Sequence, residues 1–148
     1  MNAKNISGEK NCPFCKMVRG ELDAIKVFED GEVFSIMDLY PATPGHILVL
    51  TKQHIENIYT LPESLGSHIM KVAIKISKAV KSYLSPDGLN LIQANEPAAW
   101  QTIPHFHLHI VPRYKNDTVI LKFGHGRQPA DQNELKQMAD KVNSAMMQ

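Results

Sequence analysis

Three histidines alternate with apolar residues in the run His105-Phe106-His107-Leu108-His109. Imidazole titrates near neutral pH and can serve as a nucleophile, as an acid or base, or as a metal ligand. Residues two apart in a strand share one face, so the three imidazoles should lie together while Phe106 and Leu108 face the core. That face should look into a cleft or onto solvent, because three imidazoles without partners are costly to bury. A polar strand face with incidental histidines is the plainer alternative.

A second group that can do chemistry is the pair of cysteines in Cys12-Pro13-Phe14-Cys15. In a reducing compartment this spacing indicates metal binding or redox chemistry more than a structural disulfide. A redox dithiol of the glutaredoxin type would follow a buried first strand and open a helix. Residues 1–11 contain no apolar run that could form such a strand, which argues against the redox reading.

Composition limits the classes of protein that the chain can be. With 148 residues, it can bury one substantial core, so we expect a single domain over residues 12–148 after a flexible tail, residues 1–11. A formal net charge of +1 gives no general attraction to a nucleic-acid backbone. No apolar run approaches the roughly 20 residues that span a bilayer, and the polar N-terminus does not resemble a secretory signal. We therefore expect a cytoplasmic protein without membrane or nucleic-acid partners.

Periodicity predicts the elements that must position these side chains. Apolar residues recur every three or four positions over residues 63–84, which predicts one long amphipathic helix. Extended runs are expected at residues 25–29, 33–37, 46–50, 89–93 and 105–111, with a turn at Asp30-Gly31. A short helix should cover residues 14–19, and a C-terminal helix, residues 134–146, should be capped by Asp131. The order predicts an α+β fold on an antiparallel sheet of about five strands.

The region between the fifth strand and the last helix is less regular. Residues 118–123 could form a further strand or an irregular arm, and Gly124-His125-Gly126 reads as a turn.

Residues His105 to Val111 follow the histidine triad signature, in which three histidines alternate with apolar residues and two apolar residues follow. Together with the segments 34–41 and 44–54, this run resembles the Hint-like branch of the histidine triad (HIT) family over residues 12–113. The resemblance implies a HIT-like fold, a homodimer, and a nucleotide hydrolase or nucleotidyl transferase. Its substrates would be purine nucleoside phosphoramidates or dinucleoside polyphosphates. The enzyme would attack the alpha-phosphate of these substrates, form a covalent nucleotidyl-histidine and release a nucleoside monophosphate.

The resemblance also implies roles for single residues. His107 matches the nucleophile, and His109 matches a donor to the phosphate oxygens. The nucleotide-binding positions are Asp38 for the ribose hydroxyls, Leu39 beside the base, His46 beside the triad, and Asn95, Gln101 and His109 for the phosphate or leaving group. Asp38 can also be read as a turn residue ahead of Pro41, and His46 as a surface histidine.

Two departures from the family pattern fall in the loop before the triad. Glu96 and Trp100 stand where the family usually has glycine. Because glycine admits backbone conformations that other residues resist, we expect this loop to be differently shaped or more closed. Trp100 could stack on a base or leaving group, although packing under the loop or at a subunit contact is the simpler role.

The cysteines acquire a role from the same resemblance. Cys12, Cys15, His54 and His105 would complete a two-cysteine, two-histidine zinc site, although His54 can also be read as a surface histidine. Four protein ligands leave no open position for water, so such a zinc is structural and no catalytic metal is expected.

Two other readings of the histidine run remain. One is a metal-dependent hydrolase, but a rise of about 3.3 Å per residue separates His105 from His109 by roughly 13 Å at the backbone. The other is a nucleotide-binding scaffold without turnover, which the altered loop at Glu96 and Trp100 would suit.

Overall fold

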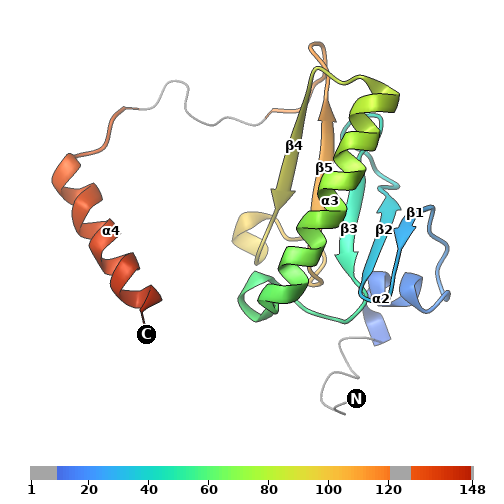
Figure 1. The fold of residues 1–148 in the computed structure, drawn as a ribbon, viewed down its shortest axis with the longest axis horizontal. Coiled ribbons are helices and arrows are strands. Elements are labelled where there is room, and N and C mark those ends of the chain that lie inside the picture. The colour runs from blue at the N-terminus through green and yellow to red at the C-terminus, as the bar shows by residue number, and fades with distance from the viewer. Residues whose placement is uncertain (1–9, 121–127, 148) are drawn as a thin grey trace.

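A computed structural model of the protein describes residues 10–120 and 128–147. The fold is α+β, with one antiparallel five-stranded sheet in the order β1-β2-β3-β5-β4 (Figure 1). The strands are β1 (Lys26–Glu29), β2 (Val33–Met37), β3 (Ile47–Thr51), β4 (Gly88–Gln93) and β5 (His107–Arg113). The predicted fold class and number of strands are confirmed, and β5 lies inside the sheet between β3 and β4.

One face of the sheet is covered by the long helix α3 (Glu63–Leu84), as Figure 1 shows. Its buried residues recur every three or four positions, as the sequence predicts, and are Leu65, Ile69, Val72, Ala73, Ile76 and Val80. They form one core cluster with Val49, Leu108 and Ile110 of the sheet. Burying an aliphatic side chain of this size contributes about 1.5–3 kcal/mol, so this face anchors β5 firmly.

The opposite face carries the short helix α2 (Pro13–Val18), which packs against β2 and β3. Phe14 and both cysteines of this helix region are buried in a second cluster with Leu48 and Leu50. Pro13 suits the first turn of the helix, where a missing N–H is tolerated. Because the side chains of β5 alternate between the faces, the histidines point toward the side of the sheet that α2 covers.

The start of the triad strand differs from the prediction. The expected strand began at His105, but β5 begins at His107, since the amides before it bond elsewhere. The N–H of His105 donates to the carbonyl of Ile103 at 2.8 Å, and that of Phe106 donates to the carbonyl of Ile55 at 2.6 Å. His105 is therefore held by the loop, while His107 and His109 stand on the sheet.

The expectation that all three imidazoles look into a cleft or onto solvent is wrong for His105, which is 0% exposed. His107 is only 4% exposed but lines a cavity, as His109 does. The cost of burial that motivated the expectation is offset, because the rings of His105 and His107 have hydrogen-bonding partners.

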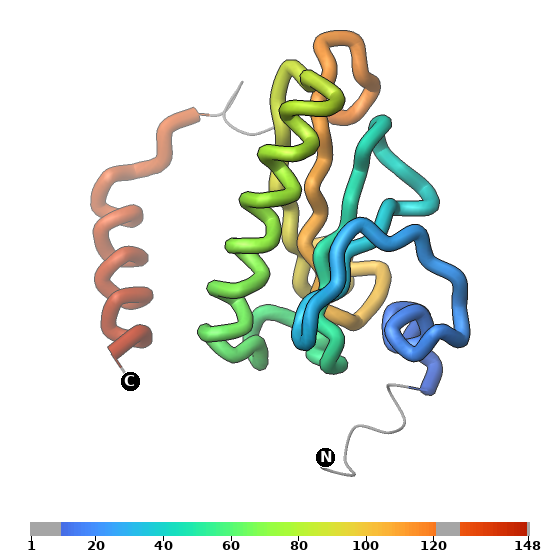
Figure 2. The backbone as a smooth tube through the Cα atoms, turned by 45° about the vertical axis from the view of Figure 1, so that its right-hand side comes forward, coloured from blue at the N-terminus to red at the C-terminus, as the bar shows by residue number. Residues whose placement is uncertain are grey.

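The C-terminal helix α4 (Gln132–Met146) begins two residues earlier than predicted and is capped by Asp131 as predicted. The cap Oδ1 accepts from the N–H groups of Asn133 and Glu134. No residue of α4 is buried, and the helix stands apart from the sheet (Figures 1 and 2). Residues 118–120 form no strand. The rest of the expected segment 118–123, the turn at 124–126 and residues 1–9 of the expected tail lie outside the described residues.

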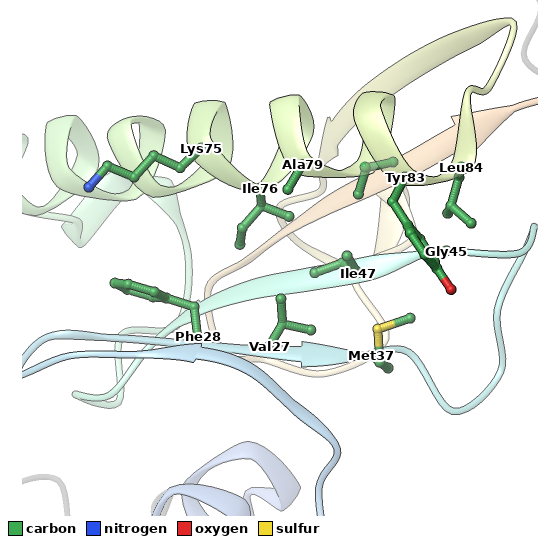
Figure 3. Close-up of a pocket in the computed structure, with 11 residues that line it drawn as sticks. Val27, Phe28, Met37, Gly45, Ile47, Lys75, Ile76, Ala79, Tyr83 and Leu84 are labelled. Carbon is green, nitrogen blue, oxygen red and sulfur yellow. The ribbon is translucent and has the colours of Figure 1, made fainter.

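Figure 3 shows an apolar groove of about 490 Å³ between α3 and the β1–β2 hairpin. Its lining includes Val27, Ile47 and Tyr83, with no histidine or carboxylate among the described residues that line it. Gly45 closes one end with φ +89°, and a Cβ there would collide with the side chain of Leu84. The chemistry of the triad therefore belongs to the other face. Among the described residues, no helix combines the length and the hydropathy needed to cross a bilayer.

Candidate functional site

A cavity of about 370 Å³ lies beside the triad on the α2 side of the sheet. Four of the predicted site residues line it, namely Asp38, Leu39, His107 and His109. The described lining is otherwise mainly apolar, with Phe14 and Met17 from α2, Leu48 from β3 and Ile103 from the loop before β5. An apolar cavity with a few polar groups at one place is typical of a site for a small organic ligand.

His107 is held in one tautomer by the backbone. Its Nδ1 lies 2.6 Å from the carbonyl oxygen of His105, so Nδ1–H donates and Nε2 keeps its lone pair. Burial lowers the pKa of His107 below its ordinary value, which favours the neutral ring at neutral pH. The ring of Phe14 packs edge-on against it at a centroid distance of 5.1 Å. A neutral imidazole with a fixed, unprotonated Nε2 is suited to act as a nucleophile.

His109 is oriented by a hydrogen-bonded chain that starts at the backbone. The N–H of Ala42 donates to Nδ1 of His46 at 3.0 Å, so a neutral His46 carries its proton on Nε2. That Nε2 lies 2.9 Å from Nδ1 of His109, which must accept. His109 therefore carries its own N–H on Nε2. The chain makes His109 a fixed hydrogen-bond donor beside His107, whose ring centroid lies 4.9 Å away.

The electrostatics keep this chain uncharged. Burial, followed by the neighbouring His107 and His46, lowers the pKa of His109 to about 4. Burial also lowers the pKa of His46, against an opposing effect of Asp38. Both imidazoles are thus neutral near pH 7, which is the state that the tautomer chain requires.

Asp38 serves two contacts with its two oxygens. Oδ1 accepts from the N–H of Tyr40 at 2.8 Å, which is the turn role considered for this residue. Oδ2 lies 3.5 Å from Nε2 of His46. Asp38 lines the cavity together with Leu39, which is 58% exposed. A carboxylate at this place can accept from the two hydroxyls of a ribose, and the turn fixes its direction.

Asp38, His46 and His109 also have the residue types of a metal site, since their ligand atoms lie within 4.8 Å of one another. The two ring nitrogens are 2.9 Å apart, which is the length of a hydrogen bond. Two nitrogens on one zinc would be about 3.3 Å apart, given bonds of about 2.0 Å. With the second nitrogen of His46 taken by Ala42, the geometry favours the hydrogen-bonded chain.

The four predicted zinc ligands meet under α2. The ligand atoms of Cys12, Cys15, His54 and His105 all lie within 4.8 Å of one another. Nδ1 of His105 lies 3.3 Å from Sγ of Cys12 and 3.5 Å from Sγ of Cys15. Nδ1 of His54 lies 3.3 Å from Sγ of Cys15. A sulfur and a nitrogen on one tetrahedral zinc would be about 3.5 Å apart, so the donor set fits the ion.

The second nitrogen of His105 strengthens this fit. Nε2 lies 2.7 Å from the carbonyl oxygen of Thr51, so Nε2–H donates and Nδ1 keeps the lone pair that faces both thiols. A zinc-bound histidine commonly donates its other N–H in this way. The cluster joins α2 to the end of β3 and to the segment just before His107.

The side-chain amides of Asn95 and Gln101 form hydrogen bonds to backbone groups of the protein. Oδ1 of Asn95 accepts from the N–H of Ile58 at 2.8 Å. Nε2 of Gln101 donates to the carbonyl of Glu56 at 2.6 Å, and its Oε1 accepts from the N–H of Glu96 at 2.8 Å. Within the described part of the chain, neither residue lines the cavity. In this state both amides hold the loop that precedes the triad.

Two residues of this loop have a backbone conformation that is typical of glycine, although neither is a glycine. Glu96 and Trp100 flank the 3-10 turn Pro97–Ala99, and each has φ +68°. Both residues thus adopt a backbone region that favours glycine. Trp100 is also 86% exposed, so it does not pack under the loop.

Two contributors to the site were missed in the sequence. Phe14 packs against His105 and His107 and lines the cavity, and Thr51 orients His105. The position of Phe14 between the two cysteines was an available signal, because any site that gathers the cysteines near His105 also brings Phe14 there. No local pattern marks Thr51.

Comparison with known proteins agrees with this geometry. Residues 19–116 match the model of the HIT domain family. The chain is 39% identical over 105 residues to the protein hit of Bacillus subtilis, covering 71% of this chain and 72% of that one. It is 26% identical over 145 residues to the adenosine 5'-monophosphoramidase of Candida albicans, with 95% of each chain covered.

Solved structures show the same fold. A HIT family protein from Bacillus anthracis superposes with a TM-score of 0.85 at 36% identity, covering 91% of this chain and 96% of that one. A zinc-bound histidine triad family protein from Mycobacterium smegmatis superposes with a TM-score of 0.71 at 32% identity, covering 93% and 99%. With its five-stranded sheet, its three alternating histidines and a family match over residues 19–116, the chain belongs to the HIT, or histidine triad, family.

Proposed function

We propose that this protein is a nucleotide hydrolase or nucleotidyl transferase that acts on the alpha-phosphate of purine nucleoside phosphoramidates or dinucleoside polyphosphates. The observation that carries the proposal is the pairing of two fixed tautomers at one cavity. Nε2 of His107 has a lone pair, because Nδ1 donates to the carbonyl of His105. Nε2 of His109 has a proton, because its Nδ1 accepts from His46. A nucleophile and a hydrogen-bond donor are what displacement at phosphorus needs.

In the proposed reaction, Nε2 of His107 attacks the alpha-phosphorus, and a P–N bond forms as the bond to the leaving group breaks. A leaving amine takes a proton from water, whereas a leaving polyphosphate departs as an anion. The N–H of His109 stabilises the charge on the phosphate oxygens. Water or a second acceptor then attacks the nucleotidyl-histidine, which releases a nucleoside monophosphate or its transfer product and restores neutral His107. The carboxylate of Asp38 would bind the ribose hydroxyls, and Phe14, Met17 and Leu48 would enclose the base.

We further propose that Cys12, Cys15, His54 and His105 hold a structural zinc ion. The ion would close a four-ligand site and so offer no position for substrate. Its contribution would be to tie α2 to the segment that precedes His107, since Cys12 and Cys15 flank Phe14 and His105 lies two residues before the nucleophile. The fit of the donor distances to a tetrahedral zinc supports this role.

A homodimer is the third proposal. Apolar side chains on the outer surface of α3 support it, because Met70 and Ile74 lie one turn apart and are 45% and 47% exposed. The sheet also ends in β4, whose outer edge is unpaired among the described residues. A two-fold contact along α3 and β4 would cover both features.

The first test is a hydrolysis assay on adenosine 5'-phosphoramidate and on a diadenosine polyphosphate, with metal-free buffer in parallel. The proposal predicts release of adenosine monophosphate in both buffers. Tight nucleotide binding without release would instead support a scaffold. Such a role would suit the observation that Asn95 and Gln101 bond to the backbone and do not line the cavity among the described residues. Release that requires added free metal would support the cluster of Asp38, His46 and His109 as a catalytic metal site.

A further inference from the structure

The turn before the triad holds a large aromatic side chain in a backbone conformation that disfavours it. Trp100 has φ +68° and ψ +32°, in the left-handed region. For a residue with a Cβ, this region is strained relative to the right-handed helix region. Glycine would adopt it without such strain. The stability of the turn therefore does not account for a tryptophan at this position.

Packing does not account for the residue either. The side chain of Trp100 is 86% exposed, although burying an aromatic ring is among the most stabilising contacts that a protein can make. The turn that carries it is nevertheless firmly built. The N–H of Trp100 donates to the carbonyl of Pro97 at 2.9 Å, and the adjacent Gln101 side chain ties the turn to Glu56 and Glu96. The indole is thus presented to solvent from a fixed base.

The place of the turn relative to the nucleophile suggests what the indole contacts. The apolar end of the cavity is formed by α2, which supplies Phe14 and Met17. Figure 1 shows α2 and the turn 97–99 on opposite sides of the start of β5, where His107 stands. A nucleoside bound at the α2 end therefore leaves the rest of the substrate to extend toward the side of the turn. In displacement at phosphorus, the leaving group departs in line with the attacking atom and away from it.

We propose that Trp100 is a specificity-determining residue that stacks on an aromatic ring carried by the leaving group. This inference rests on the proposed function and deepens it by naming the preferred substrate class. The ring can be the second base of a dinucleoside polyphosphate or an aryl group on a phosphoramidate nitrogen, because both present a flat π-face. An unsubstituted phosphoramidate, which loses ammonia, gives the indole nothing to stack on.

Trp100 is the single tryptophan of the chain, so its fluorescence reports the contact directly. The protein to use is His107→Ala, which should bind substrates without turning them over. Titration with diadenosine polyphosphate, and separately with an aryl phosphoramidate of adenosine monophosphate, should change the emission of Trp100. Adenosine monophosphate alone should leave it unchanged, because its base occupies the far end. Equal changes with all three ligands, or none, would overturn the proposal.

Turnover gives an independent readout with matched variants. Stacking on an aromatic side chain is worth roughly 5- to 100-fold in affinity, so Trp100→Ala should lower kcat/KM for the diadenosine substrate by about that factor. Its kcat/KM for adenosine 5'-phosphoramidate should stay within about twofold. Trp100→Phe should restore much of the loss. Tyr83→Ala removes an equally exposed aromatic residue, at 88%, from the end of α3 and should change neither value.

Three outcomes separate the possible failures. An equal loss on both substrates in Trp100→Ala would make the residue a structural part of the loop and overturn the proposal. A drop from dimer to monomer in light scattering, with that equal loss, would make it an interface residue and overturn it too. Wild-type protein that releases no nucleotide from any substrate would refute the proposed function. Trp100 emission that the diadenosine polyphosphate leaves unchanged would refute the stacking contact separately.

Discussion

Nε2 of His46 lies 2.9 Å from Nδ1 of His109, while the N–H of Ala42 lies 3.0 Å from the other nitrogen of His46. A backbone amide therefore fixes the tautomer of a residue two steps away. His46 does not line the cavity among the described residues, so it acts on the reaction through the residues that it contacts, of which His109 is the nearest. This makes His46 a positioning residue and gives a prediction that a purely structural role would not share.

Replacing His46 by alanine should lower kcat while changing KM little. Without the Nε2–H donor, His109 can place its proton on either nitrogen, and the donor to the phosphate is lost in part. Removing one donor to a transition-state oxygen lowers kcat by roughly 100-fold or more, so a loss of about 10- to 100-fold is expected for this indirect effect. Steady-state kinetics on one substrate suffices to measure it.

The matched control is His46→Gln, whose side-chain amide can donate to His109 in the same direction. It should recover a large part of the kcat that His46→Ala loses. If the two variants are equally slow, or if both mainly raise KM, the hydrogen-bonded chain is not what His46 contributes.

Zinc is expected at about one ion per chain in protein purified without chelators, and Cys15→Ser should reduce it to a small fraction. Loss of the ion should lower the melting temperature by roughly 5 °C or more, because α2 loses its tie to His105. Elemental analysis and calorimetry measure the two effects. Cys12→Ser should behave alike, and the double variant should be no worse than either single one, since each alone breaks the site. Full zinc content in both single variants would contradict the assignment.

Stability should fall on acidification between about pH 6.5 and pH 4 in a way that depends on His109. Burial lowers the pKa of His109 from 6.5 to about 4 in the folded protein, so in this window the unfolded chain binds more protons. The stabilising contribution is therefore complete above pH 6.5 and is lost as the pH falls through the window. One such group changes the unfolding free energy by at most about 1.4 kcal/mol per pH unit.

Urea unfolding of wild type and His109→Gln at several pH values isolates this contribution. The zinc ligands titrate identically in both proteins, so only the difference in slope is interpreted. A wild-type slope that is steeper than that of the variant is expected. Parallel curves would show that His109 does not titrate with a lowered pKa.

The proposed dimer should depend on the outer surface of α3. Replacing Met70 and Ile74 by glutamate places two charges in the proposed contact, which should yield a monomer by light scattering at micromolar concentration. Lys75→Glu changes the charge on another side of the same helix and should leave the dimer intact. A wild-type monomer, or a double variant that remains dimeric, would remove this contact surface from the account.

Sequence periodicity predicted the sheet, both longer helices and the cap at Asp131, because these depend on local spacing. Groups of residues that meet only through tertiary contacts were harder to predict from local spacing. The grouping of Cys12, Cys15, His54 and His105 came from resemblance to a family, since no spacing rule joins positions 90 residues apart. Full burial of His105 was missed because its partner, the backbone carbonyl of Thr51, leaves no sequence pattern. At Glu96 and Trp100, hydrogen bonds around the turn override the residues' backbone preference.

The covalent mechanism is tested most directly by the mass of the enzyme during turnover. Wild-type protein quenched in acid-free denaturant with an adenosine 5'-phosphoramidate substrate should carry an added adenylyl group, and peptide mapping should place it on His107. His107→Ala should fold, keep its zinc, carry no adduct and release no nucleotide. An adduct on another residue, or near wild-type turnover by His107→Ala, would contradict the covalent mechanism.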